Sequence, residues 1–346
     1  MTLQDTASGT SAVLRAGGAD RRGSIVGAVI AIAITGVLLA LVPIWIGDSR
    51  SLMGVAVEGL LFACYVIAFN IIFGSTGQLF LCVGALAGVG AFSSALLADR
   101  LGVPFPLAML LAALASSLIA GTFSWIAVRR SLDVIFTGIV TLTFALGFTN
   151  LLVGQGDLTG GENGLVVTAG KESFLRNQIP PYYAFLVLVL VFLVFYAVLH
   201  RSHVGWAFRA LRDDEVAAEL SGVNVARYRI YAGAIGGAML GFSGALWAHS
   251  EGFISPDTFA FANVDVRVLV MLVFGGIGTL MGPVVGAAVF TYIGEVLASF
   301  SQLRLIAEGT LLIVLFLVFP QGVVRAIRSG VERLFRTRSP PRPPEA

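Results

Sequence analysis

The stretch SIVGAVIAIAITGVLLALVPIWI, residues 24–46, decides the fold class of this chain. It holds no charged residue over slightly more than the roughly 20 residues that a helix needs to cross a bilayer. The whole chain agrees: 57% of its 346 residues are hydrophobic and 12% are charged, whereas soluble domains carry about 25% charged residues. Because the preceding polar leader is long and the run exceeds a signal-peptide core, we predict a retained membrane helix.

Similar runs recur along the chain and predict an all-α integral membrane protein of about ten transmembrane helices (8–10). The eighth and ninth runs meet near Gly282 and Pro283 and could form a re-entrant hairpin instead of two full spans. The expected spans are 24–46, 52–73, 79–98, 104–128, 132–153, 182–200, 228–249, 264–281, 284–299 and 303–319.

The positions of the Lys and Arg residues predict the orientation, because cytoplasmic loops are enriched in them. With both termini cytoplasmic, 16 of the 22 Lys and Arg residues fall on the cytoplasmic side. The expected organisation is a cytoplasmic polar leader (1–23), a transmembrane domain (24–320) with an external loop (154–181) and a cytoplasmic loop (201–227), and a basic, Pro-rich cytoplasmic tail (321–346).

Two short stretches repeat a glycine pattern. GSTGQL (74–79) and GGIGTL (275–280) share two glycines and a leucine at the same spacing, and each follows a span that runs from outside to inside in this topology. An internal duplication and coincidence in a chain with 41 glycines both account for the match.

The cytoplasmic loop holds a compact charged stretch, RALRDDEVAAELSGVN, at residues 209–224. We expect an amphipathic helix over residues 206–220, ended by Gly222 in a left-handed conformation. Such a helix could bind a partner or simply connect two spans in solvent. It would bring opposite charges together at spacings of three or four residues in the pairs Arg209–Asp213 and Arg212–Glu215.

Several polar residues and one flexible glycine fall within the apolar runs, where polar groups are costly and often functional. They could line a translocation path or bond neighbouring helices, and a glycine could bend the backbone as in the broken helices of transporters. The candidates are Glu58, Asn70, Gly77, Gln78, Thr141, Thr143 and Asn150.

The sequence shows no sign of its own catalytic or ATP-binding machinery. The two cysteines lie in apolar runs and no histidine has metal-ligand spacing, so we expect no metal site. The nearest match to a phosphate-binding loop, GLVVTAGK (164–171), is one residue too long and is followed by Glu172 instead of Ser or Thr. We therefore expect a transport protein, not an enzyme, with energy supplied by another subunit or by an ion gradient.

Residues 205–229, GWAFRALRDDEVAAELSGVNVARYR, resemble the cytoplasmic coupling loop of ABC-importer permeases, in particular the LivM-type permeases of branched-chain amino acid importers. The chain departs from that family at residues 82–84, where Cys-Val-Gly replaces the frequent Gly-His-Ala, which leaves the substrate open. The same resemblance extends, in the expected order, over GSTGQLFLCVGALAGVGAF (74–92), LTGGENGL (158–165), EGFISPDTFAF (251–261), LVFGGIGTLMGPVVGA (272–287) and FPQGV (319–323).

The resemblance implies two groups of site residues. One would dock into a groove of the ATPase subunit, and the other would surround the external mouth at which a binding protein delivers substrate. The ATPase-coupling group is Arg209, Arg212, Asp213, Asp214, Glu215, Ala217, Ala218 and Gly222. The external group is Thr159, Gly160, Gly161, Asn163 and Gly164.

The resemblance also implies the partners and the location. We expect a multi-pass protein of the bacterial inner membrane that works with cytoplasmic ABC ATPase subunits, a second homologous permease subunit in a heterodimer, and an extracytoplasmic substrate-binding protein. ATP and Mg would be bound by the ATPase, with no cofactor in this chain and no nucleic-acid partner. The implied function is inward movement of branched-chain amino acids or related small solutes by alternating access. The alternative is a self-sufficient secondary transporter or channel.

Overall fold

The structure is a computed structural model that describes residues 27–45, 49–167, 179–298 and 309. The predicted leader and tail, and almost all of the tenth predicted span, lie outside the described residues. The chain divides into two units, residues 1–47 and 48–346. The first unit is described only by its helix Gly27–Trp45, which covers most of the first predicted span.

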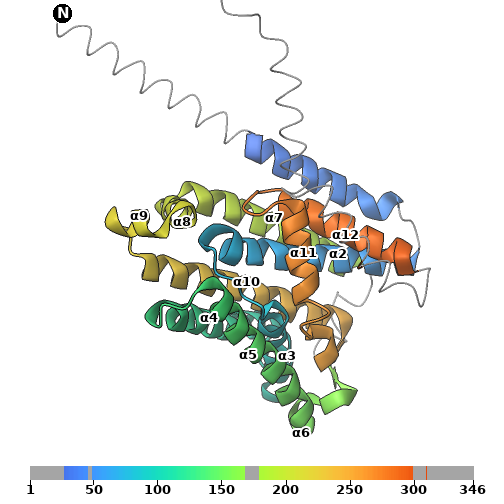
Figure 1. The fold of residues 1–346 in the computed structure, drawn as a ribbon. Helices are drawn as coiled ribbons and strands as arrows, with labels where there is room; N and C mark the ends of the chain where they lie inside the picture. The colour runs from blue at the N-terminus through green and yellow to red at the C-terminus, as the bar shows by residue number, and fades with distance from the viewer. Residues whose placement is uncertain (1–26, 46–48, 168–178, 299–308, 310–346) are drawn as a thin grey trace, which may run out of the picture. The chain divides into compact units, whose positions relative to one another are not determined.

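The second unit is built almost entirely of helices (Figure 1). In chain order they are α2 (Arg50–Phe69), which continues as the π-helical turn η1 (Asn70–Gly74), α3 (Val83–Leu101), α4 (Phe105–Arg129), α5 (Val134–Gly154), α6 (Gly156–Thr159), the 3-10 turn η2 (Gly161–Asn163), α7 (Ile179–Arg201), α8 (His203–Asp213), α9 (Glu215–Leu220), α10 (Val225–Glu251), the 3-10 turn η4 (Pro256–Phe259), α11 (Asp265–Gly275) and α12 (Gly282–Ala298). Two short strands, β1 (Leu165–Val166) and β2 (Phe253–Ile254), pair antiparallel with Leu165 opposite Ile254.

The predicted all-α membrane class is confirmed. Among the described residues, six helices are long and apolar enough to cross a bilayer: Gly27–Trp45, Ser51–Gly74, Phe105–Arg129, Val134–Gly154, Ile179–Arg201 and Val225–Glu251. The eighth predicted span, 264–281, is wrong as a continuous helix, because α11 has 11 residues and a glycine-rich loop follows it. At about 1.5 Å per residue α11 is about 16 Å long, roughly half of a bilayer core.

Helix α10 forms the core of the second unit and packs most extensively on α4 and α3. Its glycines Gly233, Gly237 and Gly241 recur every four residues and face α4, and a Cβ on Gly237 would overlap Ala120. The Ser117 hydroxyl donates to the Ala234 carbonyl across the interface at 2.9 Å. Membrane helices lack a hydrophobic drive to associate, so close approach of small residues and such bonds hold them together.

Helix α5 has the opposite character. It makes few contacts with its neighbours, and most of its apolar side chains are exposed, with Ile135 at 66% and Phe136 at 60%. In a membrane protein such a face meets lipid or another membrane subunit.

The two ends of the second unit carry different structures (Figure 1). Helices α8 and α9 lie at one end, beside the start of α10 and the turn that joins α4 to α5. Near the other end of α10 lie α6, η2, the two strands and η4. We call these the coupling end and the mouth end, after the functions predicted for their residues.

Candidate functional site

The charged segment at the coupling end is two helices, not the single helix predicted over 206–220. Asp214, with φ −159° and ψ 111°, interrupts the segment between α8 and α9. Its carboxylate accepts a hydrogen bond from the Ala217 N–H at 3.0 Å and so caps α9. Aspartate is among the best N-cap residues, because its side chain satisfies an N–H that the first helical turn leaves free.

The break changes the expected charge pairing, and within the described helices neither predicted pair forms. Glu215 instead pairs at 2.8 Å with Arg229, near the start of α10. The Arg209 guanidinium lies 4.6 Å from the centre of the Trp206 ring, a cation–π contact. The charges therefore bind α9 to α10 and order the surface of α8.

The predicted role of Gly222 in ending the helix is confirmed. It has a φ of +85°, and the Val223 N–H beyond it donates to the Ala218 carbonyl at 3.0 Å. This is a left-handed helix end of the kind that glycine favours. Of the eight residues predicted to contact an ATPase, only Ala218 is buried, and the other seven are exposed. The segment therefore has a free surface for a partner.

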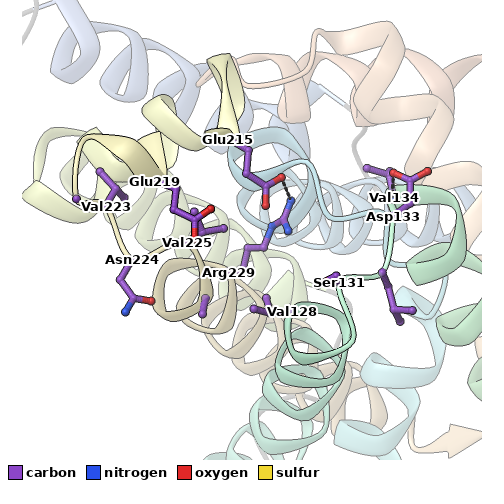
Figure 2. A pocket seen from close by; sticks show the side chains of 13 residues that line it. Val128, Ser131, Asp133, Val134, Glu215, Glu219, Val223, Asn224, Val225 and Arg229 are labelled. Atoms are coloured by element: carbon purple, nitrogen blue, oxygen red, sulfur yellow. Dashed lines mark hydrogen bonds and ion pairs between the residues drawn. The ribbon is translucent and has the colours of Figure 1, made fainter. Parts of the chain in front are cut away.

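A groove of about 780 Å³ lies beside this segment (Figure 2). One wall comes from the turn between α4 and α5, including Asp133, and the other from α9 and the start of α10, including Glu219 and Arg229. The sequence analysis missed Asp133, whose carboxylate caps α5 by accepting from the Val134 N–H at 2.7 Å. An aspartate before an apolar run signals a helix start, but no local pattern places it beside residues far along the chain.

Arg212, near the end of α8, contacts the loop between α11 and α12. Its guanidinium lies against Gly278, so closely that a Cβ on that glycine would overlap it. The Gly278 N–H in turn donates to the side-chain oxygen of Asn70 at 2.8 Å, and the Asn70 amide donates to the Thr279 carbonyl at 3.0 Å. A continuous series of contacts thus runs from the charged segment through this loop to the end of α2.

Two further contacts fasten the loop that follows α2. The Gln78 amide donates to the Arg229 carbonyl at 3.0 Å, and the Ser75 hydroxyl lies 3.1 Å from Nε2 of His200 on α7. Gly77, between them, has a φ of +71°, in line with its predicted role as a flexible backbone point.

The structure does not bring the seven candidate path residues into one line. Asn70, Gly77 and Gln78 lie together near the coupling end, and Thr141 is buried against the same loop, accepting from the Leu81 N–H at 2.9 Å. Thr143 and Asn150 are exposed on α5 and donate to carbonyls of their own helix. Glu58 lies apart from all of them, 3.6 Å from Arg267 on α11.

The residues predicted at the external mouth form a tight turn at the mouth end. Thr159 is buried and donates to the Leu152 carbonyl, while Asn163 is exposed. The three glycines of the group have positive φ angles between +61° and +78°. The turn leads directly into β1, which holds it beside β2 after α10.

Asp265 is a buried carboxylate that the sequence analysis did not single out. It begins α11 and accepts hydrogen bonds from the N–H groups of Val83 and Gly84, the latter at 3.2 Å. These N–H groups are free at the start of α3, so the carboxylate joins the starts of two helices inside the protein. Helices that begin within the membrane are a feature of transporter substrate regions.

Comparison with known proteins supports a transport role. The sequence profile of the family described as "Branched-chain amino acid transport system / permease component" matches residues 51–320. The high-affinity branched-chain amino acid transport system permease protein LivM of Escherichia coli (strain K12) is 28% identical over 310 residues, covering 81% of this chain and 71% of that protein.

More distant relatives carry other names. LivH of Salmonella typhimurium is 24% identical over 285 residues, covering 77% of this chain and 92% of that protein. The fructose import permease protein FrcC of Rhizobium meliloti is 32% identical over 124 residues, covering 35% of this chain and 34% of that protein. No solved structure matches the chain significantly. The family match covers most of the chain, including the charged segment, the two glycine loops and Asp265, and the chain therefore belongs to the permease components of branched-chain amino acid transport systems.

Proposed function

We propose that this chain is the membrane-spanning subunit of an ABC importer that moves branched-chain amino acids or related small organic solutes inward. One observation carries the proposal furthest: the exposed segment α8–α9 is not a loose connection. Arg212 lies against the α11–α12 loop, and Asn70 joins that loop to α2. A force applied to α8 at the surface would therefore act directly on two broken helices inside the bundle.

The mechanism would be alternating access. ATPase subunits on the cytoplasmic side would bind the surface of α8 and α9, and the groove beside Asp133 would be available to the same partner. ATP-driven closure of these subunits would rock α8, and the contact at Gly278 would pass the motion to α11 and α2. The chain would act with a second permease subunit in the bacterial inner membrane, and an extracytoplasmic binding protein would deliver substrate at the mouth end.

The substrate class follows from the relatives. LivM and LivH are named as permeases of branched-chain amino acid transport, whereas FrcC is named as a fructose import permease. The LivM match covers 81% of this chain and the FrcC match covers 35%. The fuller match favours amino acids over sugars.

The test is affinity purification of the full-length chain from mild-detergent membranes. We compare the unaltered chain, Gly222→Leu, the charge reversal Arg212→Glu/Asp213→Arg, and Gly156→Leu as a control. Gly156 is exposed at the mouth end and has no neighbour that an added Cβ would meet. An ATPase with a phosphate-binding loop should accompany the unaltered and control chains and be lost from the other two.

The opposite result identifies the rival function. If the chain purifies without an ATPase and moves solute across vesicle membranes in the absence of ATP, it is a secondary transporter or channel and the importer proposal is wrong.

A further inference from the structure

The mouth end contains a cavity of about 400 Å³ between α2, the end of α10 and the start of α11. Cavities of roughly 300–1,000 Å³ are typical of small-molecule sites. It lies within the second unit, and none of its lining residues belongs to the predicted path or mouth groups except Glu58.

Charges of both signs line this cavity. Glu58 of α2 and Arg267 of α11 approach to 3.6 Å, and their side chains are 43% and 30% exposed. Glu251 at the end of α10 also lines the cavity. A tight carboxylate–guanidinium bond is about 2.7–2.9 Å long, so this pair is loose, and both groups keep bonding capacity. Ionisable residues within membrane helices commonly face water-filled cavities and mark substrate or ion pathways.

Much of the remaining wall is aromatic, from Phe62, Trp247 and Phe259, and Thr258 and Asn263 add polar groups. Tyr65 also lines the cavity, and it is 1% exposed. Its hydroxyl has no hydrogen-bond partner among the residues that the structure describes. The hydroxyl oxygen also has almost no accessible surface, so Tyr65 contributes mainly its ring to the cavity wall.

We propose that this cavity binds a small zwitterionic amino acid with an apolar side chain, a proposal that rests on the proposed importer function. The Arg267 guanidinium binds the ligand carboxylate. Glu58, with Glu251 beside it, binds the ammonium group, and the ligand thereby separates a loose ion pair into two complete ones. The aromatic wall contacts the side chain of the ligand.

The same features disfavour a sugar. A neutral polyol carries no charge and would complete neither half of the Glu58–Arg267 pair. An amino acid carries its ammonium and carboxylate groups on the same carbon. Its two charges therefore match two protein charges that lie close together on adjacent helices.

The experiment measures binding of L-leucine to the purified full-length chain in detergent by saturation-transfer difference NMR. L-Leucinamide, which lacks the carboxylate, 4-methylpentanoate, which lacks the ammonium group, and D-fructose serve as comparison ligands. We expect the Kd of L-leucine to rise at least tenfold in Arg267→Gln and in Glu58→Gln. Arg267→Lys keeps the charge and should fall between Arg267→Gln and the unaltered chain.

The matched control is Glu162→Gln, which removes an exposed carboxylate at the mouth end outside the cavity. It should leave L-leucine binding unchanged, and the two analogues should bind at least tenfold more weakly than L-leucine. L-Leucine binding as tight in Arg267→Gln or in Arg267→Lys as in the unaltered chain would overturn the proposal, provided that thermal unfolding verifies the folded state of the variant. So would binding of D-fructose as tight as that of L-leucine.

Capture of the ATPase by the same variants separates this proposal from the importer function. If the cavity is not the binding site, Arg267→Gln retains both the ATPase and L-leucine binding. If the importer function itself is wrong, no ATPase accompanies even the unaltered chain.

Discussion

The loop after α2 (residues 75–82) and the loop after α11 (276–281) each contain a glycine with a left-handed φ, in different surroundings. Gly77 has a φ of +71° and Gly278 a φ of +73°, and each follows a helix that ends in a glycine. A Cβ on Gly77 would meet nothing, whereas one on Gly278 would overlap Arg212. The comparison teaches that a left-handed glycine alone does not join a loop to the charged segment; only the glycine packed against Arg212 does so.

The helices before the two loops also differ, and the difference creates the cavity. Helix α2 has 20 residues and α11 has 11. In place of further helical turns before α11, the chain runs through η4 and Asn263, which line the cavity at the mouth end. The short helix therefore leaves room for a ligand on the side away from the charged segment.

The largest effect should come from Gly278→Leu. This change forces a left-handed conformation on a residue with a Cβ, which costs about 1–2 kcal/mol, and overpacking against Arg212 adds about 1–3 kcal/mol. Gly77→Leu carries the first cost without the second. Thermal unfolding in detergent should place Gly278→Leu well below Gly77→Leu, and equal losses would show that the two loops are equivalent.

Asn70→Ala should follow. It leaves the Gly278 N–H and the Thr279 carbonyl without their partner, at a cost of about 2–4 kcal/mol in the free energy of unfolding. Asn150→Ala is the matched control, because that exposed side chain bonds only its own helix, and its loss should stay within about 0.5 kcal/mol. A similar small loss for both variants would mean that Asn70 does not hold the second loop to the first.

A double-mutant cycle sharpens the contact between Arg212 and Gly278. Arg212→Ala removes the side chain that overlaps an added Cβ, so it should rescue part of the loss caused by Gly278→Ala. The expected coupling free energy is about 0.5–2 kcal/mol, measured by the unfolding midpoints of the two single variants and the double variant. Strict additivity would show that the guanidinium moves aside freely and transmits no force.

The smallest effect should come from Glu215→Gln. Arg229, which pairs with Glu215, also accepts a hydrogen bond from the Gln78 amide of the loop after α2 through its main-chain carbonyl. The substitution of Glu215 leaves this main-chain bond in place. The ion pair is partly exposed, with the Glu215 side chain at 45% and that of Arg229 at 18%, so its loss should cost about 1 kcal/mol at most and should matter less as salt increases. A loss comparable to that of Asn70→Ala would mean that the first loop depends on the charged segment as strongly as the second.

Much of the helical organisation could be predicted from apolar runs alone. The predicted span 104–128 is close to α4, Phe105–Arg129, and 228–249 lies within α10, because long runs without charge have few alternatives to a helix. Such runs do not distinguish a helix from a glycine loop bonded to distant residues, which is why 264–281 was misjudged. The tenth span, the orientation and the internal duplication stay predictions.

The site could be predicted only where its cause is local. Gly222 was placed correctly because a left-handed glycine after a helix is a local pattern. Asp214 could have been recognised as a cap by the same kind of reasoning, yet its charged neighbours obscured it. The contacts of Arg212 with Gly278 and of Asp265 with Val83 join residues far apart in the chain, and no pattern in a single sequence specifies them.

The small-residue contact between α4 and α10 has a consequence for how the protein is made. Roughly 110 residues separate the end of α4 from Gly241, and synthesis at about 5–20 residues per second takes roughly 6–22 s to cover them. During that interval α10 is not yet packed against the face of α4 that holds Ser116 and Ala120. A chain that stops before residue 225 would keep this face uncovered, and so would differ from a finished one at a surface that membrane quality control can reach.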